Sequence, residues 1–324
     1  MISLPSQGYI RKAILFYILF SISILYGIDT SMASSSYTFP LGAFGGCDDT
    51  NRKLYLTRPY LSGSDVEELQ ERLHQLNFDP GPIDGIYGPQ TEAAVKKFQV
   101  THGFAPDGIV DDTIWKLLGK GFERPTTTKQ LNAPEGIIHL VIDTNNKTLT
   151  VYANNKPLKT YPVAVGRTET PTPVGEWKII SKSSDWGGGF GTRWMGLNVP
   201  WGIYGIHGTN KPWSIGQRAS HGCIRMFNRD VEELFNWVSV GTPVKITGQP
   251  QLPAGIKRRV LQPKSVGPDV VQVQMKLKEH GFYLGMADGR FGRMTETAVR
   301  YFQIFNNLEP DGKINQDDYQ QLGL

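Results

Sequence analysis

Cysteine is scarce in this chain, and neither cysteine has a second one nearby. The 324 residues contain two, Cys47 and Cys223, together with six histidines. A structural zinc site uses three or four Cys or His ligands at short paired spacings, and a thiol-redox centre needs a resolving cysteine close by. The chain has no CxxC pair, and no HxxxH lies near Cys223. We therefore expect no metal site and no dithiol centre.

A concentrated positive charge is also missing. Lys and Arg total 34 against 30 Asp and Glu, which gives a net charge of +4. The basic residues are scattered and do not alternate with aromatic residues as they do on nucleic-acid-binding surfaces. We expect no nucleic-acid partner, although a mildly basic protein is compatible with an anionic polymer.

Residues Ala13 to Ile28 form a nearly continuous apolar run. Arg11 precedes it, and small residues that include Ala33 follow it. This pattern is typical of a secretory signal peptide, which we place at residues 1–33. The run of 16 residues is shorter than the ~20 of a transmembrane helix, but an uncleaved signal anchor is the alternative. In both cases the rest of the chain is expected to be exported, with membrane contact only through an uncleaved leader.

Two cysteines in an exported chain also permit a disulfide bond. Cys47 lies in residues 34–60, a glycine-rich lead-in outside any predicted domain. A disulfide bond between Cys47 and Cys223 would prevent the Cys223 thiol from acting as a nucleophile. We assign Cys47 no role.

An internal repeat divides the remaining chain, whose length favours two or three domains and which has no low-complexity tract. Residues 63–118 and 267–322 align without a gap, sharing pairs such as Asp84-Gly85 with Asp288-Gly289. The sequence therefore predicts two copies of one small module, at residues 61–120 and 266–324.

Each copy predicts a bundle of three short helices. In the first copy, apolar residues recur at helical spacing from Val66 to Leu76. Ser64 and Glu67 have the form of a capping box, and Pro89 suits the first position of a second helix. Apolar residues that follow Pro89 form the buried face of the second helix. A final short helix completes the all-α bundle.

The region between the copies has the alternating pattern of β-strands. Strands are expected at Ile138–Ile142 and Leu149–Tyr152, separated by asparagine turns of hairpin type. Further strands are predicted at Glu176–Ser181, Ile203–Ile206 and Pro243–Thr247, and one helix at Asp230–Val238. We therefore predict a multidomain protein of α and β structure. A mostly antiparallel β domain at residues 135–248 lies between the two helical modules, joined to them by mobile linkers at residues 121–134 and 249–265.

Residues His207 to Arg225 carry the strongest chemical signal. Cys223 follows His221 and Gly222, and His207 lies upstream. A free thiol has a pKa of about 8.5, so a neighbouring base is needed to make it an effective nucleophile at neutral pH. The glycine permits a sharp turn whose amides can face an oxyanion. The stretch is thus a candidate for acyl transfer, with either histidine as base.

The complete motif resembles the L,D-transpeptidase catalytic family. That family has a His-Gly segment, a spacer, and then Ser/Thr-His-Gly-Cys, a hydrophobic residue and Arg or Asn. The likeness extends upstream through residues 170–175 and 191–196. The helical modules in turn resemble peptidoglycan-binding domains, through residues 84–88 and their partners in the second copy. The matching motif positions here are His207, Gly208, Ser220, His221, Gly222, Cys223, Ile224 and Arg225.

The resemblance implies a role for each motif residue. Cys223 is the nucleophile and His207 the general acid and base, oriented by the carbonyl of Gly208, with His221 as a pocket residue. The amides of His221, Gly222 and Cys223 are the implied oxyanion donors. Ser220 and Arg225 support the turn or the substrate, and Arg225 binds a stem-peptide carboxylate or backbone carbonyls. No cofactor is implied.

The implied reaction is peptidoglycan cross-linking. Cys223 forms a thioester with a tetrapeptide donor stem, and D-alanine leaves. The amine of a second stem then completes a 3-to-3 cross-link. The implied role is in cell wall biogenesis and cell shape. If water accepts instead, the enzyme is an L,D-carboxypeptidase. The remaining alternative is a non-catalytic wall-binding protein. Stem peptides and wall polymer are the expected partners, and the cell wall or the outer face of the envelope is the expected location.

Overall fold

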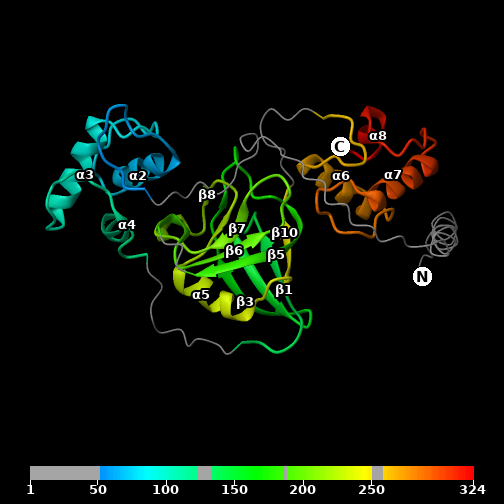
Figure 1. The fold of residues 1–324 in the computed structure, drawn as a ribbon, viewed down its shortest axis with the longest axis horizontal. Coiled ribbons are helices and arrows are strands. Elements are labelled where there is room, and N and C mark those ends of the chain that lie inside the picture. Colours follow the sequence, from blue (N-terminus) through cyan, green and yellow to red (C-terminus); the bar gives the residue numbers. More distant parts are fainter. Residues whose placement is uncertain (1–51, 123–132, 185–187, 250–257) are drawn as a thin grey trace, which may run out of the picture. The chain divides into compact units, whose positions relative to one another are not determined.

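A computed structural model describes residues 52–122, 133–184, 188–249 and 258–324, which all belong to the same unit of the chain. The predicted leader, Cys47, most of the first predicted linker and about half of the second lie outside the described residues. Figure 1 shows helical segments at the two ends of the described sequence, in blue to cyan and in orange to red, and strands in green between them.

The first module consists of α2 (Ser64–Gln75), α3 (Pro89–Thr101) and α4 (Asp112–Leu118). Pro89 begins α3 as predicted, because its missing N–H is not needed in the first helical turn. The predicted capping box is wrong. Gly63 is the N-cap of α2, with φ 154° and no side-chain cap, so Ser64 already lies inside the helix.

A buried apolar cluster joins the three helices. It includes Leu69, Leu73 and Phe98, which are at most 1 % exposed. Outside the helices, Leu54 forms a β-bridge with Val110 and ties the start of the module to the segment before α4. The predicted three-helix bundle is therefore confirmed.

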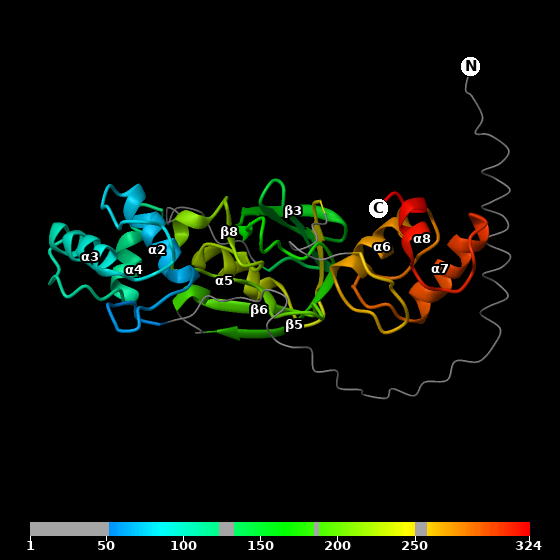
Figure 2. The same ribbon diagram turned by 90° about the horizontal axis from the view of Figure 1, so that it is seen from above.

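The second module repeats this arrangement with α6 (Pro268–Glu279), α7 (Arg293–Phe305) and α8 (Gln316–Gln321), labelled in Figure 2. Leu261 and Ile314 form the bridge that corresponds to the one in the first copy. A capping box is present here, at Asn315 and Asp318 of α8. The predicted internal repeat thus holds in three dimensions.

The central domain is built on an eight-stranded sheet with the order β3-β2-β1-β10-β5-β6-β7-β9, and β4 pairs separately with β8. Most neighbours are antiparallel, as predicted, but β1 with β10, β7 with β9 and β4 with β8 are parallel. The strands are β1 (Ile138–Asp143), β2 (Thr148–Ala153), β3 (Lys156–Pro162), β4 (Val165–Gly166), β5 (Gly175–Ser184), β6 (Arg193–Leu197), β7 (Tyr204–His207), β8 (Arg218–Ser220), β9 (Ile224–Arg225) and β10 (Pro243–Thr247).

The predicted hairpin turn between β2 and β3 is present. Asn154 and Asn155 have φ of 51° and 62°, the left-handed region that asparagine tolerates better than most residues. The short helices η1 (Gly188–Phe190) and η2 (Pro212–Ser214) lie in the longer connections.

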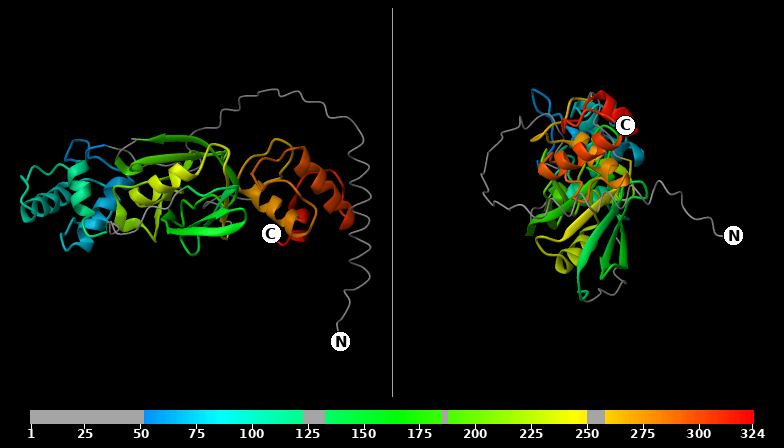
Figure 3. Two further views of the ribbon diagram at one scale, coloured as in Figure 1. Left: turned by 90° about the horizontal axis from the view of Figure 1, so that it is seen from below. Right: turned by 90° about the vertical axis from the view of Figure 1, so that its right-hand side faces the viewer.

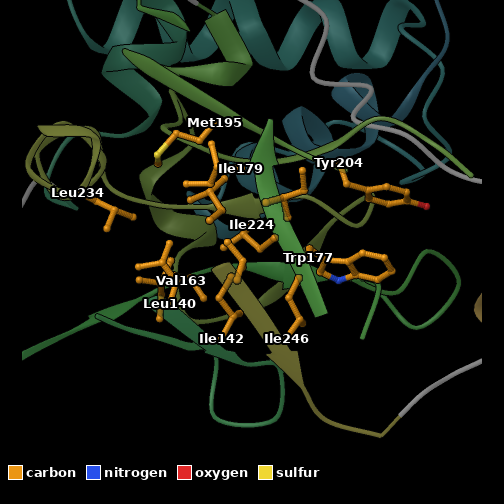
Figure 4. Close-up of a cluster of buried hydrophobic side chains, with 14 of the residues drawn as sticks. Leu140, Ile142, Val163, Trp177, Ile179, Met195, Tyr204, Ile224, Leu234 and Ile246 are labelled. Atoms are coloured by element: carbon orange, nitrogen blue, oxygen red, sulfur yellow. The ribbon is translucent and has the colours of Figure 1, made fainter. Parts of the chain in front are cut away.

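The core of this domain lies between the sheet and α5 (Asn228–Trp237), drawn in yellow beside the strands in Figure 3. Val231 and Leu234 of α5 are fully buried against it. Figure 4 shows side chains from strands far apart in sequence converging there, among them Leu140, Trp177 and Ile246. This packing fixes β7 and β9, the two strands that carry the candidate site.

No helix within the four described ranges is both long enough and apolar enough to cross a membrane.

Candidate active site

His207 is the last residue of β7 and is fully buried. Its Nδ1 lies 2.6 Å from the carbonyl oxygen of Gly208. A carbonyl can only accept, so Nδ1 carries the hydrogen and Nε2 is the nitrogen that can take up a proton. The imidazole lies near Trp194, with ring centroids 5.7 Å apart, and Phe190, at 5.2 Å. These contacts hold one tautomer and one ring orientation.

Cys223 immediately precedes β9, the strand beside β7. Ile224 pairs with Ile206 and Arg225 with His207 in parallel register. Side chains alternate along a strand, so the side chains of residues 223 and 225 are expected to lie on the same side of the sheet as His207. The Cys223 side chain is 1 % exposed, with Sγ 4.0 Å from the carbonyl oxygen of Ile203. The fold thus brings His207 and Cys223 onto adjacent segments.

The turn before Cys223 is held by Ser220. The Ser220 hydroxyl donates to the Cys223 carbonyl at 2.6 Å, and the Gly222 amide donates to the Ser220 oxygen at 3.2 Å. The Gly222 amide therefore makes a hydrogen bond within the turn, and its role as an oxyanion donor stays a prediction. His221, between them, is half-buried.

Gly222 is required by both conformation and space. Its φ is 110°, and a Cβ there would lie 2.7 Å from a ring carbon of Tyr204. Burial raises the pKa of Tyr204 to about 12, so its phenol is a neutral wall of the turn at physiological pH. Any larger residue at position 222 would displace the backbone that carries Cys223.

Cys223 is disulfide-bonded in this structure. The chain has one other cysteine, Cys47, which lies outside the described residues. A disulfide sulfur is not a nucleophile, so thiol chemistry at this site requires reduction first.

Arg225 takes part in an ion-pair cluster with a residue of the first module. Its side chain is 1 % exposed, and its Nη2 donates to Glu68 Oε1 of α2 at 2.8 Å. Lys211 forms an ion pair with the other carboxylate oxygen of Glu68. A carboxylate of the first module is a partner that neither predicted role of Arg225 included, and sequence reasoning missed Glu68 altogether.

Hydrogen bonds from residues outside the motif hold the segments around the site in place. The Arg167 amide and the Thr170 hydroxyl both donate to the Ser220 carbonyl, at 2.9 and 3.2 Å. Asn228, at the start of α5, accepts from the amides of Thr192 at 3.2 Å and Thr209 at 3.0 Å. Asn228 was also missed, although an asparagine at a helix start is a recognisable signal of such backbone bonding.

Among residues 52–122, 133–184, 188–249 and 258–324, no group of three or more His, Cys, Asp or Glu side chains is arranged to hold a metal ion.

Comparison with known proteins agrees with the geometry. Residues 138–246 match the L,D-transpeptidase catalytic domain family, and residues 62–118 and 266–322 each match a peptidoglycan binding domain family. YkuD of Bacillus subtilis, named as an L,D-transpeptidase, is 50% identical over 108 residues, which cover 33% of this chain and 65% of that protein. YqjB of the same organism, also named as an L,D-transpeptidase, is 37% identical over 131 residues, covering 36% and 74%.

The chain therefore spans just under two thirds of the first of these relatives. Among solved structures, an L,D-transpeptidase from Mycobacterium smegmatis matches with a TM-score of 0.30 and 25% identity, covering 34% of this chain and 58% of that one.

Proposed function

The chain belongs to the L,D-transpeptidase family, and on that premise we propose that it forms 3-to-3 cross-links in peptidoglycan through a thioester on Cys223. Its two flanking modules are peptidoglycan-binding domains. A family that acts on peptidoglycan works in the cell wall or envelope, and a role in wall biogenesis and cell shape follows from the proposed reaction.

The single observation that carries the proposal is the hydrogen bond between His207 Nδ1 and the Gly208 carbonyl, on the strand next to the Cys223 segment. Because Nδ1 holds the proton, Nε2 is the nitrogen that can act as base. This supports His207 over His221 as the general base.

The proposed reaction begins with the reduced thiol. His207 Nε2 takes the proton of Cys223, and the thiolate attacks the carbonyl between the third residue of a donor stem and its terminal D-alanine. The C–N bond breaks, His207 returns the proton to the leaving amine, and a thioester remains. An acceptor amine then attacks the thioester and loses a proton to His207. The proton passes to the departing sulfur, which restores the thiol.

The test is intact-protein mass spectrometry of residues 34–324 incubated with a purified disaccharide tetrapeptide. Reactions are run with and without a phosphine reductant, for the native chain and for Cys223→Ala. We expect an acyl adduct, released D-alanine and cross-linked dimer with the native chain only after reduction. Cys223→Ala should give none of them, because it has no thiol.

A Cys47→Ser variant is the matched control for the disulfide. Since Cys47 is the chain's other cysteine, this variant should be active without reductant. Tripeptide in place of dimer would show that water is the acceptor and that the enzyme is an L,D-carboxypeptidase. Retained binding to sacculi with no adduct and no turnover in any condition would leave a wall-binding protein and overturn the proposal.

A further inference from the structure

A buried carboxylate from the first module joins the two segments that carry His207 and Cys223. Glu68, on α2, is 4 % exposed. It binds Lys211 and Arg225, which are 3 % and 1 % exposed. We call these three residues the Glu68 cluster.

The two cations of the cluster lie close in sequence to the two proposed reacting residues. Lys211 lies four residues after His207, and Arg225 lies two residues after Cys223. Arg225 is also paired with His207 in the β7 and β9 register. The Glu68 carboxylate therefore links the segment that follows His207 to β9, the strand that follows Cys223.

Further contacts from the same module hold the loop between those two segments. Trp115 of α4 stacks with Trp213, at 6.2 Å between ring centroids and 18° between planes. The Arg72 guanidinium carbon lies 5.1 Å from the Trp213 ring centroid. A Cβ on Gly119 would lie 2.9 Å from the ring carbons of Pro212, so the Pro212 ring packs closely on the backbone of Gly119. The module thus contacts η2 as well as both ends of the loop.

The charge arrangement of the cluster depends on all three partners. Taking a carboxylate out of water is costly unless it is paired, and removing one member of a buried ion pair leaves an uncompensated charge. The second module has Gln272 at the equivalent position. The carboxylate is therefore a feature of the first copy and is not required by the fold of the module.

We propose that Glu68 is a positioning residue, which holds His207 and Cys223 in register from outside the catalytic domain. The first module is then a fixed part of the active site, in contrast to the movable tether that its predicted linker suggested. The inference rests on the proposed function only in taking His207 and Cys223 as the reacting groups.

The test uses the full chain with the disulfide reduced, comparing the native protein, Glu68→Gln and Lys211→Met. The first measurement is the rate of Cys223 alkylation by iodoacetamide between pH 5 and 9, which needs no wall substrate. The second is kcat and KM with the tetrapeptide. The control is Glu92→Gln, the same chemical change in the same module at a residue paired with Lys96 on the surface of α3.

We expect Glu68→Gln to lower the alkylation rate at pH 7 at least ten-fold and to move the midpoint of its pH profile. We expect kcat to fall by a similar factor while KM stays within two-fold. Lys211→Met, which keeps the bond between Glu68 and Arg225, should show a smaller loss in the same direction and covers the case in which Glu68→Gln does not fold. Glu92→Gln should match the native chain.

The proposal is overturned if folded Glu68→Gln or Lys211→Met, judged by thermal unfolding, alkylates at the native rate or faster with an unchanged pH midpoint. A native chain that alkylates normally but never turns over substrate would count against the proposed function alone, since the alkylation comparison still stands.

Discussion

The two helical modules have the same interior but different outer faces. In the first, Gln70 donates to Asp84 at 3.0 Å, and in the second, Gln274 donates to Asp288 at 3.2 Å. The same glutamine also donates to a threonine hydroxyl in each copy. These shared polar bonds and the shared apolar positions specify the fold of the module.

The difference lies on one helix, on the side that faces the catalytic domain. The first copy has Glu67, Glu68 and Glu71 on α2, where the second has Val271, Gln272 and Met275 on α6. The glutamates meet cations of the catalytic domain, Arg167 among them.

The apolar residues instead join the catalytic core. Val271 is 1 % exposed and belongs to the same buried cluster as Trp201, and Met275 packs against that cluster. A Cβ on Gly289 would lie 2.3 Å from the Trp201 ring, and the Glu176 amide donates to the Ala287 carbonyl at 2.9 Å. The comparison shows that the corresponding face of the repeated helix pairs charges in the first module and buries apolar side chains in the second, because a few residues differ.

The largest predicted effect is on the apolar contact. Val271→Asp places an unpaired carboxylate in the catalytic core and should cost about 3–5 kcal/mol in the free energy of unfolding. Chemical denaturation followed by tryptophan fluorescence measures it. Met294→Asp adds the same charge to the same module at a position that is 60 % exposed and should change little. Equal stabilities for the two variants would show that α6 does not dock through Val271.

A smaller effect is predicted at the edge of the charged contact. Glu67 accepts from Arg167 at 2.7 Å, and the two side chains are 36 % and 19 % exposed. Glu67→Gln should therefore cost only about 0.2–1 kcal/mol in the free energy of unfolding. The difference should disappear near 1 M NaCl, where the screening length falls to about 3 Å. If it persists in high salt, the pair behaves as a buried one. Val271→Asp should keep its cost in salt.

Much of this architecture was predictable because its signals are local. The repeat, the start of α3 at Pro89 and the asparagine turn after β2 each depend on residues close in sequence. The motif likewise identified the segment around Cys223. Local patterns failed where two residues compete for the same role. Ser64 has a side chain suited to capping a helix, but Gly63, which precedes it, is the N-cap of α2.

The missed residues are those whose partners lie far away in sequence. Glu68 binds Arg225 across 157 positions, and Asn228 binds amides that precede it by 19 and 36 positions. Periodicity does not reveal such contacts. A comparison of the two copies would have drawn attention to Glu68, because it is an acid that the fold of the module does not need. The parallel pairing of β1 with β10 was hidden for the same reason.

The smallest predicted effect is a difference between the modules in acid. Hydrogen bonds from Gln70 and the Ile86 amide lower the pKa of Asp84 in the first module. That contribution to stability is present above the ordinary value of 3.8 and is lost as pH falls toward the lower folded pKa. In the second module burial raises the pKa of Asp318, so its contribution is present below 3.8 and is lost as pH rises through the folded pKa.

Acidification from pH 5 to pH 3 should therefore weaken the first module relative to the second. Module-resolved hydrogen exchange, corrected for the intrinsic rate at each pH, measures the difference. Asp84→Asn removes one titrating group and should reduce the acid sensitivity of the first module only. If acid weakens both modules equally, the pKa difference between the two aspartates has no measurable consequence. The acid response is then determined by the glutamine hydrogen bonds that the modules share and by their contacts with the catalytic domain.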